Sequence, residues 1–168
     1  MENTYVSPEG NPEIWAEKPE GYFTEDEWAE LQKPPLEAEK AKAIEALRLK
    51  KWEMKEAGIT VNGIAIDTDD RGQATINGAV TNCLINPAFT TNWKTSAVDE
   101  NGASVWMQLG KDLILALSHA LTSYTEACFA VEAHKQDEIA GLATVEEIEN
   151  WLVSRIDEGW PSREINLG

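Results

Sequence analysis

The stretch Gly110–Ala140, GKDLILALSHALTSYTEACFAVEAHKQDEIA, sets the fold class because its pattern predicts one long helix. Its apolar side chains recur three or four residues apart, which places them on one helical face. A helix with such a stripe has to cover other elements, so the segments around it decide the architecture. The stripe comprises Leu113, Leu117, Ala120, Tyr124, Ala127 and Val131, and Ile114, Leu121 and Cys128 lie beside it.

Short β-branched runs before this helix predict a small sheet. Two of them, within Ile59–Asp67, flank Asn62-Gly63, and Asn-Gly is the strongest short signal for a two-residue hairpin turn. Thr91–Thr95 and Ser104–Gln108 flank a turn rich in Asp, Asn and Gly, which predicts a second strand pair. A two-stranded hairpin is marginal in water unless a helix covers one face. The fold class predicted is therefore α+β, with a small antiparallel sheet or hairpins packed on the long helix.

A second long helix is predicted over residues 36–57, which are rich in Glu, Ala, Lys, Leu and Arg. Ile44, Leu47 and Met54 lie close to one face, and Trp52 flanks it. Six basic residues line the rest, interleaved with five acidic ones, so a solvated face is favoured over a nucleic-acid patch. The basic residues are Lys40, Lys42, Arg48, Lys50, Lys51 and Lys55.

Capping signals place two more helices. One runs from about Asp69 to Asn86 and stops before Pro87, with Thr68, Asp69 and Asp70 supplying capping oxygens and negative charge at its start. The last begins near Thr144, where Thr144 and Glu147 have capping-box spacing, and ends before Gly159.

The search for catalytic and metal sites gives negative expectations. Asp67–Gly72 begins like a calcium loop, but Arg71 takes the third ligand position and Gly78 stands where that loop needs Glu. Capping is the favoured role of its carboxylates, Asp67, Asp69 and Asp70. His119 and His134 are about four helical turns apart and have no nucleophile placed beside them. We therefore expect no metal, no cofactor and no enzymatic activity.

Residues 1–34 differ from the rest in composition. They carry nine acidic and two basic side chains and four of the seven prolines. Pieces so often interrupted by Pro and Gly cannot bury a core of their own, yet an inert tail is normally poor in aromatics. Thr24 and Glu27 have capping-box spacing, which predicts a short helix from about Glu25 to Gln32. We expect an extended docking segment whose partner-binding residues are Trp15, Tyr22, Phe23 and Trp28.

The chain thus divides into three predicted parts. Residues 1–34 form the acidic aromatic docking segment, 35–57 an amphipathic connecting helix, and 58–168 a small α+β domain. A length of 168 residues and an apolar fraction of 42% suit one core with an appendage.

Net charge limits the classes of partner. The chain has 30 acidic against 14 basic residues, a formal charge of −16, so it would be repelled by nucleic acid and by anionic membranes. The N-terminus lacks the basic start and apolar stretch of a signal peptide, so we expect synthesis in the cytoplasm. Cys83 and Cys128 lack Cys-x-x-Cys spacing and are interpreted as buried thiols.

Several pieces between Leu49 and Pro161 resemble an uncharacterised domain family that is common in phages and prophages. That family often forms the C-terminal part of tail-fibre assembly proteins. The order and spacing of the pieces carry the resemblance, which covers about two thirds of the chain and brings no catalytic residue. Ala97–Ala103 departs from the family pattern as an insertion. The matching pieces are Arg48–Glu53, Gly58–Gly63, Thr68-Asp69-Asp70 with Gln73, Trp93-Lys94-Thr95, Ala127-Cys128-Phe129 and Ile156–Pro161.

The resemblance implies a non-enzymatic tail-fibre assembly protein, a chaperone that binds a phage tail-fibre or baseplate protein in the host cytoplasm. The alternative is a structural component that stays in the tail of the mature virion, and association with further copies of the chain is open in both cases. A chaperone leaves the particle, whereas a component stays.

Overall fold

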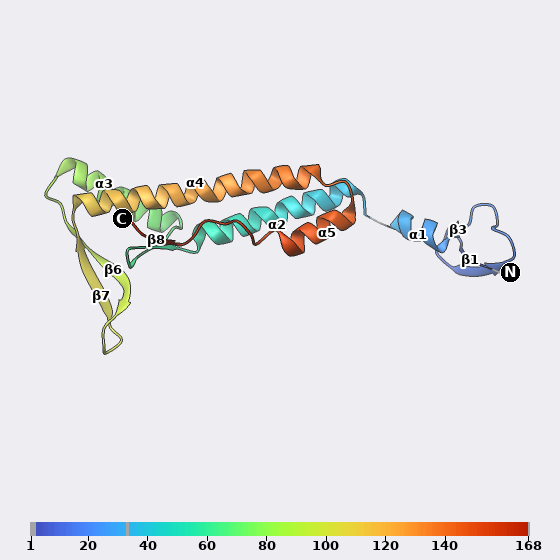
Figure 1. The fold of residues 1–168 in the computed structure, drawn as a ribbon, viewed down its shortest axis with the longest axis horizontal. Coiled ribbons are helices and arrows are strands. Elements are labelled where there is room, and N and C mark those ends of the chain that lie inside the picture. Colours follow the sequence, from blue (N-terminus) through green and yellow to red (C-terminus); the bar gives the residue numbers. More distant parts are fainter. Residues whose placement is uncertain (1–2, 33, 168) are drawn as a thin grey trace. The chain divides into compact units, whose positions relative to one another are not determined.

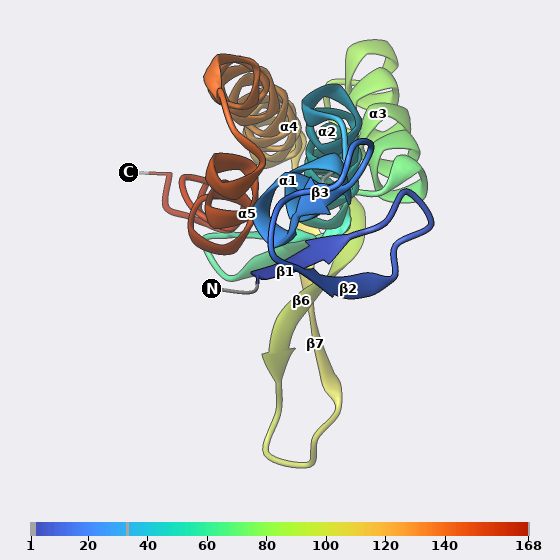
Figure 2. The same cartoon turned by 90° about the vertical axis from the view of Figure 1, so that its right-hand side faces the viewer.

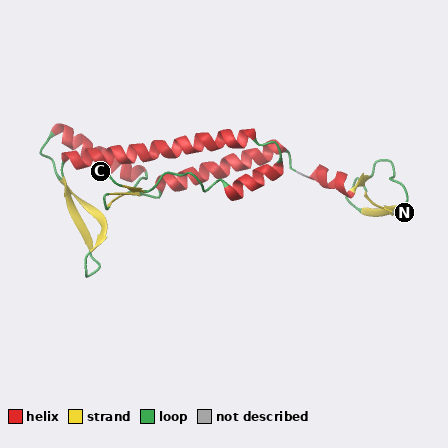
Figure 3. Ribbon diagram, in the orientation of Figure 1, coloured by secondary structure: helices red, strands yellow, loops and turns green. Residues whose placement is uncertain are grey.

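The computed structural model describes residues 3–32 and 34–167, which divide into two compact units, Met1–Glu39 and Lys40–Gly168. Within the described residues there are five helices and three small sheets, among them one helix of 31 residues (Figure 3). The α+β class predicted from the sequence is confirmed.

The first unit contains three short strands and a helix. The strands form an antiparallel sheet in the order β2-β1-β3, and Val6 and Ser7 at the end of β1 are buried. Thr24 and Glu27 form the predicted capping box at the start of the helix. The elements are β1 (Asn3–Val6), β2 (Pro12–Trp15), β3 (Phe23–Thr24) and α1 (Glu25–Gln32).

The expectation that this region is extended was therefore wrong. The chain reverses after β1 because Ser7 closes a turn: its carbonyl accepts from the amide of Gly10, and its hydroxyl accepts from the amide of Asn11. Gly10 has a φ of +88°, a left-handed conformation that glycine adopts without strain. Backbone pairing between β1 and its two neighbours, rather than a periodic apolar face, orders the segment.

Two long helices of the second unit run antiparallel, α2 (Leu36–Glu56) and α4 (Lys111–Gly141) (Figure 1). The Lys40 Nζ donates to the carbonyl of Ala140 near one end, and the Tyr124 hydroxyl donates to the carbonyl of Met54 near the other. The last helix, α5 (Val145–Ser154), lies against the end of α4, and its Trp151 indole donates to Glu138 over 2.8 Å. The predicted capping box at Thr144 is confirmed.

The main core forms where α4 meets α3 (Asp70–Ile85) and the sheet before it. Ile114, Leu121 and Cys128, which were expected beside the apolar stripe of α4, are buried. Three residues of the predicted stripe itself, Leu113, Ala127 and Val131, are only half-buried. The helix is thus rotated from the predicted orientation, because α3 contributes Ile76, Ala79 and Cys83 to the same core. The buried residues of α4 are Ile114, Leu117, Ala120, Leu121, Tyr124, Cys128, Lys135 and Ile139.

By length and composition alone, α4 is long and apolar enough to cross a membrane. A core helix of a soluble protein has the same properties, and this one buries eight residues against its neighbours. Packing in the core accounts for its apolar character. Both cysteines are buried and free, as the sequence predicted.

The predicted hairpin around Asn62-Gly63 is confirmed as β4 (Ile59–Val61) and β5 (Ile64–Ile66), with both turn residues at positive φ. A third strand, β8 (Glu164–Ile165), pairs parallel to β4 and was not predicted. It is two residues long, too short for a periodic signal. The C-terminal segment thereby closes one edge of this sheet.

The second predicted strand pair is also present, as β6 (Thr91–Val98) and β7 (Ser104–Leu109). It forms a separate two-stranded sheet, an arm that extends away from the helices of its unit (Figure 2). The Trp93 indole fixes the base of the arm by donating to the carbonyl of Ala65 over 2.9 Å.

The interpretation of the basic residues of α2 as a solvated face was wrong for Lys51 and Lys55, which are buried. Their ammonium groups lie 3.9 and 4.6 Å from the ring centroid of Trp52, and Lys51 is 3.6 Å from Glu132. The apolar stems of both lysines are buried, while their ammonium groups contact the aromatic face of Trp52 and, for Lys51, a carboxylate. A count of charges along the helix cannot distinguish this arrangement from a solvated face.

Candidate protein-docking site

An open apolar hollow of about 480 Å³ lies in the first unit between the segment before β3 and α1. Tyr22 and Phe23 form its aromatic wall, and Leu31 closes it from α1. The Thr24–Glu27 capping box fixes the start of α1 directly after β3, so the two walls of the hollow are held in place relative to each other. We call this hollow the docking groove. Its lining residues are Lys18, Gly21, Tyr22, Phe23, Glu27, Glu30 and Leu31.

The structure pairs the four predicted partner-binding aromatics. The rings of Trp15 and Tyr22 meet edge to face, with centroids 6.2 Å apart, and those of Phe23 and Trp28 lie 5.5 Å apart. Tyr22 and Phe23 line the docking groove, and Trp15, 44% exposed, extends the aromatic surface beyond it. Such pairs hold flat, rigid apolar surfaces in place.

Trp28 has a different setting from the other three aromatics. It is half-buried, and a Cβ added at Gly10 would lie 3.0 Å from its ring, so the indole covers the β1–β2 turn. With Phe23 it forms a small apolar contact between sheet and helix. Trp28 therefore contacts Phe23 of the groove wall and does not itself line the groove.

Two exposed apolar residues of the first unit were missed in the sequence. Ile14 on β2 is 68% exposed and Leu31 on α1 is 60% exposed. Leu31 follows Trp28 by three positions, a spacing that places both near one helical face. That signal was present, whereas the exposure of Ile14 depends on which face of the sheet is covered and could not be read locally.

The charge around the docking groove is negative. The unit from residue 1 to residue 39 has eleven acidic and two basic side chains, a net charge of −9. At the rim Lys18 forms an ion pair with Glu27, and this hydrogen bond, followed by that from the Thr24 amide, lowers the pKa of the Glu27 carboxyl. The Tyr22 hydroxyl donates to Glu13 over 3.1 Å, and desolvation, then Glu13, raises its pKa.

Titratable groups of the second unit serve its interior. Burial raises the pKa of Tyr124 to about 12 and also raises that of the neighbouring Cys128 thiol. Both shifts move ionisation of these groups further above neutral pH. Burial lowers the pKa of Lys135, whose ammonium donates to the carbonyl of Arg155 at the end of α5.

The residues considered for metal binding have other contacts in the structure. Asp69 caps α3, its carboxylate accepting from the Gly72 amide over 2.7 Å, which confirms the predicted capping role. His119 contacts Ser123, and His134 lies 3.4 Å from Glu138; both rings are exposed. Within residues 3–32 and 34–167, no group of three or more His, Cys, Asp and Glu side chains is placed to hold a metal ion.

Comparison with known proteins identifies the second unit. Residues 38–152 match the family described as Domain of unknown function (DUF4376), which is more than half of the chain. The chain belongs to this family. The match begins within α2 and ends within α5, so it leaves residues 1–37, nearly all of the first unit, outside. No curated protein and no solved structure matches the chain.

Proposed function

We propose that the protein is a phage tail-fibre assembly protein, a non-enzymatic chaperone that holds a fibre protein through the docking groove. The observation that carries the proposal is an open aromatic groove on a unit of net charge −9 that lies outside the family match. The sequence resemblance between Leu49 and Pro161 supports the assignment to fibre assembly.

The chemistry of the groove suits an unassembled fibre end. Such ends expose apolar surface and unpaired strand edges until the trimer forms, and these promote aggregation. Tyr22, Phe23 and Leu31 offer an apolar seat, and Trp15 widens it. Aromatic residues in such a seat commonly contribute most of the binding energy. The acidic surroundings favour a segment with basic residues beside its apolar anchor and speed encounter with it.

The test is co-expression with the tail-fibre protein of the same phage genome, followed by measurement of soluble trimeric fibre. We expect the chain to raise the yield and to co-purify with the fibre, and Leu31→Ala, at the groove wall, to weaken co-purification. Leu84→Ala is the matched control, because it also removes an exposed apolar side chain but from α3 of the second unit. Equal co-purification by wild type and Leu31→Ala would contradict the assignment of the groove.

A structural virion component is the second candidate, and exposed apolar side chains on the helices of the second unit favour it. Ile44 and Leu49 on α2 and Val153 on α5 are exposed and could pack against neighbouring subunits of a particle. Mass spectrometry of purified virions separates the two functions. A chaperone is absent from the particle, whereas a component is present in fixed proportion to the fibre.

A further inference from the structure

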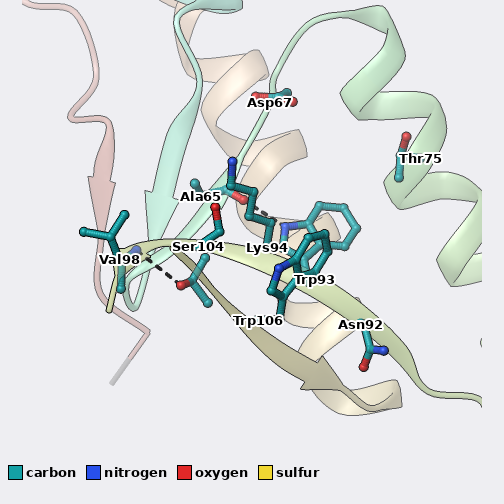
Figure 4. A pocket seen from close by; sticks show the side chains of 11 residues that line it. Ala65, Asp67, Thr75, Asn92, Trp93, Lys94, Val98, Ser104 and Trp106 are labelled. Carbon is teal, nitrogen blue, oxygen red and sulfur yellow. Dashed lines mark hydrogen bonds between the residues drawn. The ribbon is translucent and has the colours of Figure 1, made fainter. Parts of the chain in front are cut away.

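A second hollow, of about 610 Å³, lies in the second unit between the β6–β7 arm and the wall formed by β5 and α3. Figure 4 shows Trp93, Lys94 and Trp106 on the side of the arm and Asp67 and Thr75 on the side of α3. A further hollow of about 410 Å³ shares Asp67, Thr75 and Trp93 with it and adds Asp69 and Arg71. We call the two together the arm groove.

The arm side of the arm groove carries an exposed aromatic platform. Trp106 is 63% exposed, although it is one of the largest apolar side chains in the chain. Its cross-strand partner is Lys94, so both side chains stand on the same face of the arm. Trp93 is fixed by its hydrogen bond to the Ala65 carbonyl and anchors the strand that faces Trp106. A flat apolar ring is therefore held at the surface without a partner from its own chain.

Polar groups with free bonding capacity surround this platform. Within the described part of the chain, the side chains of Asp67, Asn92 and Lys94 make no hydrogen bond or ion pair. The Thr75 hydroxyl donates to the Arg71 carbonyl over 2.9 Å and keeps its lone pairs for an incoming donor. The groove thus offers a carboxylate acceptor, an ammonium donor and an amide that does both.

The charges of the arm groove balance. Asp67 and Asp69 are opposed by Arg71 and Lys94, giving a net charge of zero in a chain whose total is −16. A groove for phosphorylated ligands would carry an excess of basic groups, and the Lys94 ammonium beside Trp106 repels a cation from that ring. Balanced charge with donors and acceptors around an aromatic ring suits a neutral ligand that has many hydroxyls and one apolar face.

We propose that the arm groove binds a neutral saccharide. A pyranose ring presents C–H groups on one face, which stack on an indole, and hydroxyls around its edge that both donate and accept hydrogen bonds. Trp106 supplies the stacking surface, and Asp67, Asn92 and Lys94 bond the hydroxyls. The volume of the larger hollow, about 610 Å³, lies within the range of small-ligand sites. This inference does not rest on the function proposed above, because the docking groove belongs to the other unit.

Ligand-observed NMR and calorimetry with the full chain test the proposal. The probes are the neutral disaccharides maltose, lactose and N,N′-diacetylchitobiose, with glucose 6-phosphate and glucosamine as charged controls. We expect at least one neutral probe to bind with a dissociation constant on the order of 1 mM or below, and both charged probes to bind at least about tenfold more weakly. Absence of binding by every neutral probe, or equal binding of the charged ones, would overturn the proposal.

Variants locate the site. Trp106→Ala is expected to weaken saccharide binding about tenfold or more, and Trp106→Phe, which keeps an aromatic face, to retain most of it. Asn92→Ala removes the amide that would bond the saccharide hydroxyls, and because Asn92 is exposed the variant should weaken saccharide binding with the fold intact. Leu84→Ala, which removes an exposed apolar side chain of the same unit that does not line the arm groove, is the control and leaves saccharide affinity unchanged. The groove would not be a saccharide site if Trp106→Ala and Asn92→Ala both bound saccharide like the wild type. The same would follow if these variants lost binding of the fibre protein while the wild-type chain bound no saccharide.

Discussion

Replacement of Gly72 by alanine should destabilise the second unit, although alanine is the better helix former. Gly72 lies in the first turn of α3, against the backbone that leaves β5. A Cβ there would be 2.0 Å from the Asp67 carbonyl oxygen, 2.5 Å from its carbon and 2.8 Å from the Asp67 Cβ. The nearest contact is about 1.5 Å shorter than the optimum between non-bonded atoms, and two of the three atoms are backbone. Either the helix or the preceding segment has to move.

The magnitude follows from three contributions. Overpacking costs about 1–3 kcal/mol, and more where rigid backbone blocks relaxation. The shift would also strain the cap in which Asp69 accepts from the Gly72 amide, and such a cap contributes about 1 kcal/mol. Higher helix propensity returns about 1 kcal/mol. We expect a net loss of about 1–3 kcal/mol, and displacement of the wall that carries Thr75.

The same helix supplies the control, because a Cβ added at Gly78 meets nothing within 4 Å. Gly78→Ala should therefore raise stability by about 0.5–1 kcal/mol through propensity alone. The assay is chemical denaturation followed by circular dichroism, with both variants and the wild type at one pH. Equal stabilisation by the two substitutions would refute the close approach of α3 to Asp67.

Three further changes test the core and its electrostatics. Leu117→Ala should cost about 2–5 kcal/mol in thermal unfolding because Leu117 is fully buried, while Leu115→Ala on the exposed side of α4 costs much less; similar losses would contradict the orientation of the helix. The pKa of Glu27 is lowered in the folded state, so its ionised carboxylate stabilises the first unit above the unfolded pKa of about 4.5, and this stabilisation is lost as pH falls through the folded pKa. Glu27→Gln should therefore flatten the loss of amide protection in α1 at acid pH. Burial lowers the pKa of Lys135, so wild-type stability should rise with pH between the folded value and 10.5, and Lys135→Met should lack that rise in melting curves taken across this range.

Local chemistry made much of the second unit predictable. Asn62-Gly63 determined a hairpin turn, and the oxygens of Asp69 and Thr144 fixed the starts of two helices. These signals act over a few residues, so no knowledge of the remaining chain is needed. The rotation of α4 was missed because two adjacent stripes have similar apolar content, and only the position of α3 decides between them.

Long-range pairing made the rest unpredictable. The sheet of the first unit forms because β1 pairs with β2 along one edge and with β3 along the other. Strand β8 forms only through pairing with β4, about a hundred positions earlier in the chain. Burial of Lys51 depends on Trp52 and Glu132 together. For the docking groove, composition drew attention to aromatic residues, but it could not show that Tyr22 and Phe23 line the groove while Trp28 does not. The polar groups of the arm groove come from three separate elements and give no sequence motif.

The central claim is that the first unit holds the partner, and hydrogen exchange of the full chain with and without the tail-fibre protein tests it most directly. The account predicts slower exchange of backbone amides from Pro12 to Gln32, which cover β2, β3 and α1, with little change in α3 and α4. Trp15→Ala should reduce that protection, and Leu84→Ala should leave it as in the wild type. Protection confined to the second unit, or no change over Pro12 to Gln32 at saturating fibre protein, would contradict the claim.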